Sequence, residues 1–472
     1  MSAIEQNVRA VVEQVVDRMV ADTAPSSTEA KGAGVVSEMD RLIDAAQQAQ
    51  QELVGTTLEK RRQIIQNIRE AVIEDVETLS RVAVEETGFG NYKDKVVKNR
   101  LAALKTPGVE DIEPVTYTDD YGMTLVERAP YGVIGSITPC TNPTETIICN
   151  GIGMIAGGNS VVFNPHPAAK KTSQHTIALL NRAVEKAGGP SHLFAALSEP
   201  TIESAQAMMK HPEIALLVVT GGPGVVKAAM QSGKKVIAAG PGNPPVVVDE
   251  TADTAAAGRD IVLGASLDNN IVCICEKEIL AVGSIADELK ESMKTNGAYQ
   301  LNSTQTDRVT EMVIQDPGKP GHEGAPHKKY IGKDAAVIAE AVGINIGGDT
   351  KILLCEVDRN HPLVWTEQLM PVIPLVRMGN AGEAIDFALQ CEHGFRHTAS
   401  IHSKNIDNLS RMARVMDCSI FVKNGPNYCG LGHRGAGFPS YTIASPTGEG
   451  LTRARTFTRE RRCTLVGSFR IV

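Results

Sequence analysis

The sequence lacks an excess of basic residues and has no uninterrupted apolar run long enough to cross a membrane. Its 47 Lys and Arg are outnumbered by 55 Asp and Glu, which gives a net charge of −8. This balance, without a local basic cluster, argues against a broad nucleic-acid surface. The most apolar stretch, residues 146–163, is interrupted by Asn150, Asn159 and several glycines, which favours a buried helix and strand. We therefore expect neither nucleic acid nor a membrane as a partner.

The cysteines lack the pattern of a disulfide framework or a zinc site. Their number, nine, is odd, and no second pair stands at zinc-ligand spacing. The N-terminus is charged and lacks the apolar segment of a secretory signal. We therefore expect reduced thiols, a cytoplasmic location and no metal. The cysteines stand at positions 140, 149, 273, 275, 355, 391, 418, 429 and 463.

Alternating segments predict an α/β protein with more than one domain. A length of 472 residues exceeds what one compact core accommodates. Helical patterns cover residues 37–54 and 57–87. From residue 133 to 249, and again from 261 to about 422, short β-branched runs alternate with helical segments, as in βαβ units with a parallel sheet. In the first series we expect strands at 133–137, 160–163, 215–219, 236–238 and 246–248.

Residues 1–20 predict an amphipathic helix that is separate from the rest of the chain. Ser2 and Glu5 have capping-box spacing, and apolar residues from Ile4 to Met19 recur at helical intervals. Residues 21–36 have the small, polar composition of a flexible linker. An isolated helix of this length is marginal in water, so its apolar face needs a partner: the enzyme body, a membrane or another protein. Acidic residues on the polar face and the lack of an aromatic anchor disfavour a membrane.

One cysteine stands in a run that is suited to covalent chemistry. Cys273 lies in LDNNIVCICEKEIL, residues 267–280. A thiolate can attack a carbonyl carbon and leave a thioester that remains activated for transfer. Most lone cysteines, by contrast, are buried structural residues. Cys275 follows two positions later, and on an extended segment the two side chains would share a face.

Two motifs precede this cysteine. Asn142 lies in SITPCTNP, residues 136–143, and the run AAGPGNPP occupies residues 238–245. Alone, an asparagine before a proline is usually a turn residue. The order of the three motifs resembles the aldehyde dehydrogenase superfamily, in which an asparagine donates to an oxyanion, a glycine-rich strand end follows, and a cysteine is the nucleophile. The resemblance makes Cys273 the nucleophile and Asn142, with the Cys273 backbone N–H, the oxyanion donor.

The glycine-rich run indicates which branch of the superfamily this is. Hydrolytic members carry a glutamate there that activates water, and the matching residue here is Ala239. The chain therefore resembles the CoA-acylating branch, and within it the propionaldehyde and acetaldehyde dehydrogenases of bacterial microcompartments. The resemblance covers residues 37–472 and is carried by the runs DNNIVCICEK, EHGFRHT and VTGGPG together.

The resemblance also implies a NAD site. Residues 151–156 match G-x-G-x-x-A, but they lack the acidic residue expected further on, and the resemblance places them in a helix where the glycines serve packing. Asn164 stands where many members have a lysine at the adenosine ribose, which leaves NAD and NADP open. Glu367 matches the glutamate that holds the nicotinamide ribose. The other residues expected at the dinucleotide are Ile137, Pro139, Thr141, His166, Pro167, Thr220, Gly221, Gly222 and Val225.

His393, in the run EHGFRHT, has two interpretations. It could be a base for attack by the CoA thiol, or a structural turn residue, and we favour the second.

The implied fold is α/β, with two parallel-sheet domains and a β-arm for oligomerisation. The NAD-binding domain would comprise residues 37–110 and 129–241, and the catalytic domain residues 242–454. The arm would comprise residues 111–128 and 455–472, with a C-terminal strand at 464–472 pairing with it.

The implied reaction is the CoA-dependent oxidation of a short-chain aldehyde, propanal or acetaldehyde, to acyl-CoA with reduction of NAD. The alternatives are a hydrolytic aldehyde dehydrogenase and a catalytically silent scaffold, and intact Cys273, Asn142 and Glu367 argue against the scaffold. Residues 1–20 resemble the encapsulation peptides of microcompartment cargo, which dock on shell proteins. We therefore expect a homo-oligomer, dimer or tetramer, inside a bacterial microcompartment.

Overall fold

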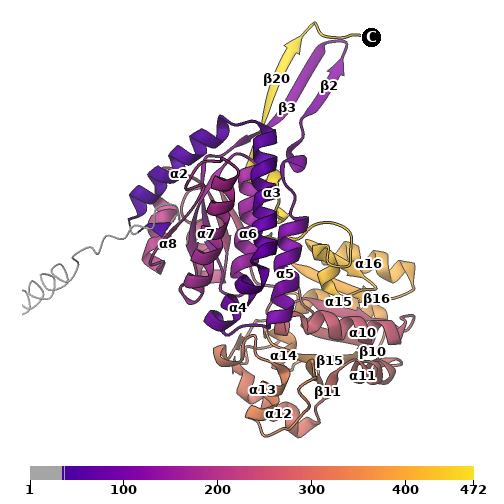
Figure 1. Cartoon of the computed structure of the whole chain (residues 1–472). Coiled ribbons are helices and arrows are strands. Elements are labelled where there is room, and N and C mark those ends of the chain that lie inside the picture. Colours follow the sequence, from indigo (N-terminus) through magenta and orange to yellow (C-terminus); the bar gives the residue numbers. More distant parts are fainter. Residues whose placement is uncertain (1–34, 37) are drawn as a thin grey trace, which may run out of the picture.

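A computed structural model describes residues 35–36 and 38–472 of the chain (Figure 1). Two helix-covered parallel sheets form the body, and a three-stranded antiparallel sheet projects from it as an arm. The α/β class, the two parallel sheets and the arm are confirmed. The helix expected at residues 1–20 and most of the linker expected at 21–36 lie outside the described residues.

Four helices follow one another from residue 39 to residue 105, and local capping explains where two of them begin or end. Thr57 accepts a hydrogen bond from the N–H of Lys60, so it satisfies one of the free donors at a helix start. Gly88, with φ of 67°, ends another helix in the left-handed conformation. The pattern expected over 57–87 forms two helices, because the chain breaks at Asp75. The helices are α2 (Met39–Val54), α3 (Leu58–Glu74), α4 (Val76–Thr87) and α5 (Tyr92–Lys105).

The first sheet has six parallel strands in the order β1-β6-β5-β4-β7-β8. Helices cover both faces, so successive residues of a strand are buried on opposite sides. Ile134 packs with α3, α6 and α7, whereas Val133 packs with α2 and α8. The elements are β1 (Val35–Val36), β4 (Val133–Thr138), α6 (Pro143–Ala156), β5 (Ser160–Pro165), α7 (Lys170–Lys186), β6 (Phe194–Leu197), α8 (Ile202–Lys210), β7 (Ile214–Thr220), α9 (Pro223–Met230) and β8 (Val236–Ala239).

The strand β1 corrects one expected boundary. Val35 and Val36 pair in parallel with Ala196 and Leu197 of β6. The flexible linker expected to reach residue 36 therefore ends earlier, because these two residues find backbone partners at the sheet edge. Over the residues that the structure describes, no helix combines the length and the apolar character needed to span a bilayer.

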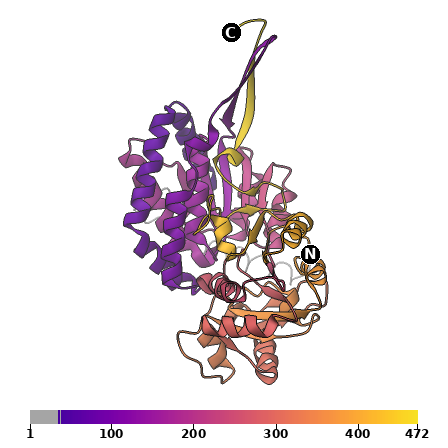
Figure 2. The ribbon, with the colours of Figure 1, turned by 90° about the vertical axis from the view of Figure 1, so that its right-hand side faces the viewer.

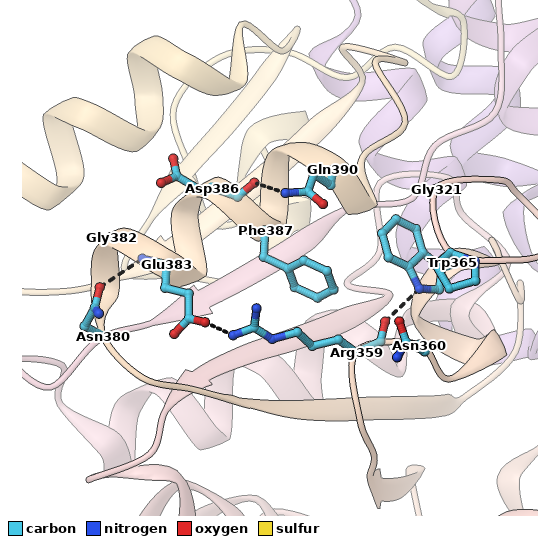
Figure 3. Close-up of a pocket in the computed structure, with 11 residues that line it drawn as sticks. Gly321, Arg359, Asn360, Trp365, Asn380, Gly382, Glu383, Asp386, Phe387 and Gln390 are labelled. Carbon is cyan, nitrogen blue, oxygen red and sulfur yellow. Dashed lines mark hydrogen bonds and ion pairs between the residues drawn. The ribbon is translucent and has the colours of Figure 1, made fainter.

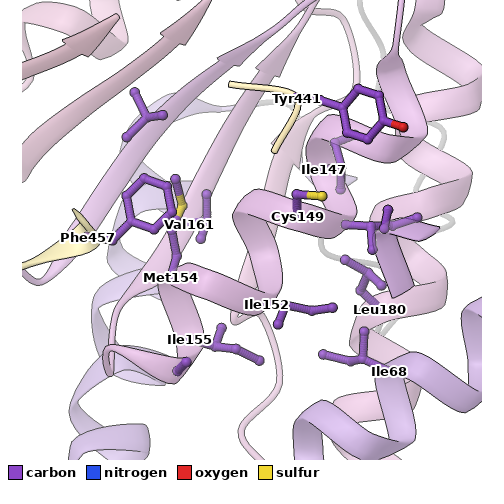
Figure 4. Close-up of a cluster of buried hydrophobic side chains, with 14 of the residues drawn as sticks. Ile68, Ile147, Cys149, Ile152, Met154, Ile155, Val161, Leu180, Tyr441 and Phe457 are labelled. Carbon is purple, nitrogen blue, oxygen red and sulfur yellow. The ribbon is translucent and has the colours of Figure 1, made fainter. Parts of the chain in front are cut away.

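Helix α6 runs through the centre of the first domain and is buried along its length (Figure 4). A Cβ atom at Gly151 would lie 3.0 Å from the Phe194 ring, and one at Gly153 would lie 3.1 Å from the Phe457 ring. The glycines of the G-x-G-x-x-A match therefore allow close packing inside a helix, as the resemblance implied.

The second sheet has seven parallel strands in the order β11-β14-β15-β10-β9-β16-β17. Ile279 faces α10 and α11, and its neighbour Leu280 faces α15 and α16. The strands are β9 (Pro245–Val248), β10 (Glu278–Val282), β11 (Ala298–Gln300), β14 (Ile352–Glu356), β15 (Val372–Met378), β16 (Thr398–His402) and β17 (Ile420–Lys423). The helices are α10 (Thr254–Ala265), α11 (Ala286–Thr295), α12 (Ser303–Val313), α13 (Ala335–Ala341), α14 (Pro362–Trp365), α15 (Ala381–Cys391) and α16 (Ile406–Met416).

After β17 the chain returns to the first domain. Tyr428, Tyr441 and Ile443 belong to the same core cluster as α6. The Oγ1 atoms of Thr442 and Thr220, on β7, lie 2.7 Å apart. Apolar side chains from the last part of the expected catalytic domain, residues 242–454, therefore complete the core around α6. This part contains β18 (Ile443–Ala444) and β19 (Gly450–Leu451).

The arm consists of β2 (Val115–Asp119), β3 (Gly122–Pro130) and β20 (Thr458–Val466), in the order β2-β3-β20. It extends well away from the body in both views (Figure 1, Figure 2). The predicted pairing of the C-terminal strand with the arm is confirmed. The strand lies at 458–466 instead of 464–472, because its partner β3 begins at Gly122, opposite Val466. β3 also continues beyond the expected boundary at 128, to Pro130.

Candidate active site

The residues expected at the site on the first domain gather at one edge of its sheet. In the strand register Ile137 pairs with Asn164 on one side and with Val219 on the other, and Thr220 pairs with Ala239. All of these residues lie at the C-terminal ends of adjacent strands. This edge is where ligands bind in open α/β sheets.

The site residues on the second domain lie at the N-terminal edge of its sheet. Cys273, Glu367 and Gly242 stand in the loops that precede β10, β15 and β9, which are neighbours in the sheet. The loops contact each other, since the N–H of Lys277 donates to the Pro244 carbonyl at 3.0 Å. The C-terminal edge of the first sheet and the N-terminal edge of the second meet at Lys98, whose Nζ contacts Asn142 on the first and Asp268, in the loop before Cys273, on the second.

Cys273 lies in a turn between the short helix η3 (Leu267–Asn270) and β10. Its side chain is half-buried and packs against the core of the first domain. Burial raises the pKa of the Cys273 thiol to about 12, the negative charge of Glu367 acts in the same direction, and Lys277 and Lys98 oppose them. The resting thiol is therefore protonated at neutral pH, so attack requires loss of that proton.

Cys275 differs from Cys273 in its surroundings. It is fully buried, and its Sγ lies 3.7 Å from the Leu267 carbonyl oxygen. The N–H of Cys275 donates to the Val272 carbonyl at 3.0 Å, so the backbone turns here. The expectation that the two cysteines share one face of an extended segment is therefore wrong.

The loop before Cys273 has an unusual backbone. Asp268, Asn269 and Asn270 have φ of 48°, 56° and 64°, so three successive residues adopt the left-handed conformation. Asn and Asp tolerate this conformation best among residues with a side chain. Their side chains bond to the N–H of Asn91 at 2.8 Å and to the carbonyls of Gly332 at 3.0 Å and Glu276 at 2.9 Å. These bonds hold the loop and account for the DNN part of the motif.

Asn142 follows β4 at the start of α6 and is almost fully buried. Its Oδ1 accepts a hydrogen bond from Lys98 Nζ at 2.6 Å, and its Nδ2 lies 3.3 Å from Thr141 Oγ1. An ammonium group only donates, so it must face the amide oxygen. The Nδ2 donor is therefore directed away from the lysine.

Lys98 belongs to a buried network of charges that the sequence analysis missed. Its Nζ lies 2.6 Å from Asp268 Oδ2 and 2.8 Å from Glu145 Oε1, and Lys95 Nζ lies 3.0 Å from Asp268 Oδ2. Burial acts to raise the pKa of Asp268, but Lys95 and Lys98 lower it below its ordinary value. Lysines are almost never fully buried without partners. The sequence signal was weak: two lysines three residues apart on a helix rich in charge normally face solvent.

Gly242 connects the parts of the site on the second domain. Its N–H donates to Glu367 Oε1 at 3.3 Å. A Cβ atom at this position would lie 2.9 Å from both the Cys273 carbonyl oxygen and the His397 ring, so only glycine fits. Burial raises the pKa of Glu367 to about 7 against the opposing charge of Lys277, so this carboxyl titrates near neutral pH.

His397 is a second residue that the sequence analysis missed. It is fully buried, its Nδ1 lies 2.8 Å from Thr398 Oγ1, and its Nε2 has no hydrogen-bond partner among the residues that the structure describes. Burial lowers the pKa of His397 to about 3, so the ring is neutral. His393, from the same motif, stands in a turn with φ of 57° and its Nε2 lies 2.9 Å from the Trp365 carbonyl oxygen. The motif pointed to this region, but only the fold shows which histidine lies beside Gly242.

Ala239 is the last residue of β8 and is buried. The next residue, Gly240, has no room for a side chain, because a Cβ atom there would lie 2.9 Å from Pro446. This strand end therefore carries no ionisable group.

The remaining residues expected at the dinucleotide lie along the first edge. Asn164 is buried and its Oδ1 accepts from Ser204 Oγ at 2.6 Å, whereas His166 and Pro167 are exposed. Gly222 is the N-cap of α9 and has no side chain, and a Cβ atom there would meet open space. Thr138 Oγ1 is buried without a hydrogen-bond partner in the described part of the chain. The edge thus has an uncapped helix start and free polar atoms, which fit a dinucleotide diphosphate. Of the other expected residues, Ile137 is buried, and Pro139, Thr141, Thr220, Gly221 and Val225 are half-buried.

A cavity of about 750 Å³ lies elsewhere on the second domain (Figure 3). Its lining includes Arg359, which forms an ion pair with Glu383 and lies 5.4 Å from the centre of the Phe387 ring. None of the residues expected at the two sheet edges lines it. It is therefore separate from the candidate site.

Comparison with known proteins gives matches over most of the chain. Residues 20–438 match the model of the aldehyde dehydrogenase family. The chain is 48% identical to the acetaldehyde dehydrogenase (acetylating) EutE of Salmonella typhimurium, over 99% of this chain and 100% of that protein. It resembles the crystal structure of Rhodopseudomonas palustris propionaldehyde dehydrogenase with bound CoA and an acylated cysteine, with a TM-score of 0.89 and 47% identity over 92% of this chain and 98% of that one.

A further solved structure is a propionaldehyde dehydrogenase from the fucose utilisation bacterial microcompartment of Clostridium phytofermentans. Its TM-score is 0.90 and its identity 47%, over 93% of this chain and 100% of that one. The match of the family model over most of the chain, together with these relatives, shows that this protein belongs to the aldehyde dehydrogenase family.

Proposed function

We propose that this protein oxidises a short-chain aldehyde, acetaldehyde or propanal, to its acyl-CoA and reduces NAD. The balanced reaction is aldehyde + NAD⁺ + CoA thiol giving acyl-CoA + NADH + H⁺. The observation that carries the proposal is that Gly242, three residues after Ala239, lies against the Cys273 carbonyl, while the strand end at Ala239 has no base to activate water. The relatives support it, since they are named as acetylating and propionaldehyde enzymes and one has CoA and an acylated cysteine.

Cys273 performs the covalent steps. Its sulfur attacks the carbonyl carbon and forms a thiohemiacetal, and the proton from the thiol leaves to a base. Loss of hydride from this carbon leaves a thioester on the enzyme. NAD, when bound at the edge of the first sheet, supplies the hydride acceptor.

Asn142 stabilises the oxygen that becomes negative in the first step. Its Nδ2 donor faces away from Lys98, and the Cys273 N–H is the second donor. Burial of the site excludes water from the thioester, and the thiol of CoA then attacks it and releases acyl-CoA. Glu367, with a pKa of about 7, is a suitable group to hold the nicotinamide ribose and to accept a proton near neutral pH.

The test measures NADH formation from propanal and acetaldehyde with and without CoA. We expect steady turnover only with CoA. Without CoA, a burst of about one NADH per active subunit should stall because the thioester accumulates. Steady production of free carboxylic acid without CoA would contradict the proposal. Parallel assays with NAD and NADP identify the preferred dinucleotide.

We also propose that residues 1–20 direct the enzyme to the protein shell of a microcompartment. The support is the capping-box and amphipathic pattern in the sequence, and a relative that comes from a bacterial microcompartment. Deleting these residues should leave kcat and KM unchanged and abolish co-sedimentation with shell particles. Fusion to a fluorescent protein should recruit it to the shell. Undiminished shell binding of the truncated enzyme, or loss of its activity, would refute this role.

The arm supports a third proposal, that the protein is a homo-oligomer, dimer or tetramer. All residues of β2 are exposed on both faces, and Tyr121 at the hairpin tip is 82% exposed. Such a sheet, projecting from the body, is suited to pairing with another subunit. Replacing exposed Leu465 and Val466 with aspartate should reduce the mass measured by light scattering, and an unchanged mass would exclude a role for this end of the arm.

A further inference from the structure

Lys98 contacts both halves of the candidate site from helix α5. Its Nζ lies 2.6 Å from Oδ1 of Asn142, on the first domain. The same Nζ lies 2.6 Å from Oδ2 of Asp268, in the loop that leads to Cys273. The lysine is 2% exposed, so water does not compete for these contacts.

We propose that Lys98 is a positioning residue for the acylation of Cys273: it orients the amide of Asn142 so that its NH₂ group faces the aldehyde oxygen. This rests on the proposed function, in which that NH₂ group stabilises the oxyanion. Lys98 does not touch the reacting atoms in this role and acts through Asn142.

The chemistry of the contact supports the proposal. An asparagine side chain can present either its oxygen or its nitrogen to a neighbour, and the two orientations have the same shape. Beside an ammonium group only the oxygen is acceptable, because the flipped amide would place two donors against each other. A charge-assisted hydrogen bond of this kind is short and strong, as the 2.6 Å distance shows. A preorganised donor avoids reorientation during the reaction.

The surrounding charges argue that Lys98 is not needed only to neutralise Asp268. Lys95 stands one turn earlier on α5, and its Nζ lies 3.0 Å from the same Oδ2 atom. Its other hydrogen bond is to the Thr141 carbonyl at 3.5 Å, and it does not bond to the Asn142 side chain. Buried ion pairs often contribute little net stability. Lys95 is therefore a matched control, because it is also a lysine on α5 that contacts Asp268, but it does not contact the Asn142 amide.

The experiment is a double-mutant cycle on the rate constant of the NADH burst without CoA. The first change is Lys98→Met with Glu145→Gln, which removes one positive and one negative charge together. The second change is Asn142→Ala. We expect the first to slow the burst about 10-fold or more when Asn142 is present, and less than ~3-fold when it is absent, because the lysine acts through the amide. Equal fold-losses in both backgrounds would overturn the proposal.

The control is Lys95→Met with Glu145→Gln, which has the same net charge. Its fold-effect on the burst should be the same with and without Asn142, and coupling as large as that of Lys98 would overturn the proposal. Replacing Lys98 should not change the KM for NAD, since Lys98 orients the amide that faces the aldehyde oxygen and not a group that binds NAD. If the methionine variant does not fold, Lys98→Gln with Glu145→Gln provides the same test, because a neutral amide does not select the orientation of Asn142.

The cycle also separates this inference from the proposed function. If Asn142→Ala alone leaves the burst rate unchanged, the oxyanion role of Asn142 fails and the inference fails with it. If Asn142→Ala slows the burst, and replacing Lys98 slows it by the same factor with and without Asn142, only the inference fails.

Discussion

The two sheets contribute opposite edges to one site, and the residues at these edges differ in kind. At the C-terminal edge of the first sheet the side chains expected to contact ligands include the neutral hydrogen-bonding groups of Asn142, Asn164 and Thr220. At the N-terminal edge of the second sheet they are ionisable and buried, such as Cys273 and Glu367. The first edge has the shape and donors to hold ligands, and the second holds the groups whose protonation changes.

The pKa shifts at the second edge all favour the uncharged form of the side chain. Burial keeps the Cys273 thiol protonated, raises the carboxyl pKa of Glu367 and keeps His397 neutral. A site that disfavours charge is a site from which water is excluded. This matches a mechanism in which a thioester must survive until a thiol, and not water, reaches it.

The strongest test of this difference between the two edges is to replace the nucleophile at the second edge. Cys273→Ala should abolish NADH formation from aldehyde, because Cys273 is the one described thiol of this turn that is half-buried, whereas Cys275 is buried. Cys275→Ala should keep a substantial part of the activity, since its sulfur is enclosed in the core. An active Cys273→Ala enzyme with an inactive Cys275→Ala enzyme would reverse the assignment.

A smaller loss is expected at the first edge. Asn142→Ala should lower kcat by roughly 10²-fold or more, as for other oxyanion donors, with little change in the KM for NAD. The measurement is steady-state kinetics with propanal, together with a test that the chemical step limits the rate. If kcat is unchanged under that condition, Asn142 is only a turn residue.

The buried carboxyl group of Glu276 predicts that the folded protein loses stability as the pH rises. Burial raises the pKa of Glu276 from 4.5 to about 8. Its Oε1 accepts from the Asn427 N–H at 2.7 Å, and over residues 35–36 and 38–472 its Oε2 has no hydrogen-bond partner. The unfolded chain releases this proton above pH 4.5 and the folded chain keeps it until about pH 8, so folded stability falls across that window. Each pH unit between the two pKa values corresponds to at most about 1.4 kcal/mol.

Glu276→Gln should remove this loss. Its Tm should equal that of the parent near pH 5 and exceed it by a margin that grows up to pH 8 and then stays constant. Thermal melts from pH 5 to 9 give the measurement, and Asp287→Asn, an exposed carboxyl with a lowered pKa, is a control that should not show this trend. A pH-independent difference for Glu276→Gln would contradict the assigned burial effect.

The smallest effect is expected from a substitution that introduces a base at the first edge. Ala239→Glu would place a carboxyl where hydrolytic relatives of the superfamily carry theirs, and we expect a low rate of carboxylic acid release without CoA. The rate should be small, because a base must be placed within a fraction of an ångström to be effective. Ala239→Gln has the same size without the charge and should release no acid, and acid release by both variants would show that cavity disruption, and not base catalysis, admits water.

Local patterns in the sequence were sufficient for the elements and for most of the first edge. Runs such as 133–137 and 160–163 are apolar on both sides because helices cover both faces of the sheet, and they became β4 and β5. The motif order pointed to Cys273, Asn142 and Ala239. Parallel βαβ units bring successive strand ends to the same edge, so Ile137, Asn164 and Thr220 could be placed together without a structure.

Only the tertiary structure decided the contacts between segments that are distant in sequence. Lys98 is buried because Asp268, 170 residues later, comes to lie beside it, and no local pattern on α5 distinguishes such a lysine from an exposed one. The same holds for the choice of His397 over His393, for the turn that separates Cys273 from Cys275, and for the return of residues 427–457 to the first domain. Periodicity reports which face of one element is apolar, whereas the partner of a buried charge depends on how whole domains pack.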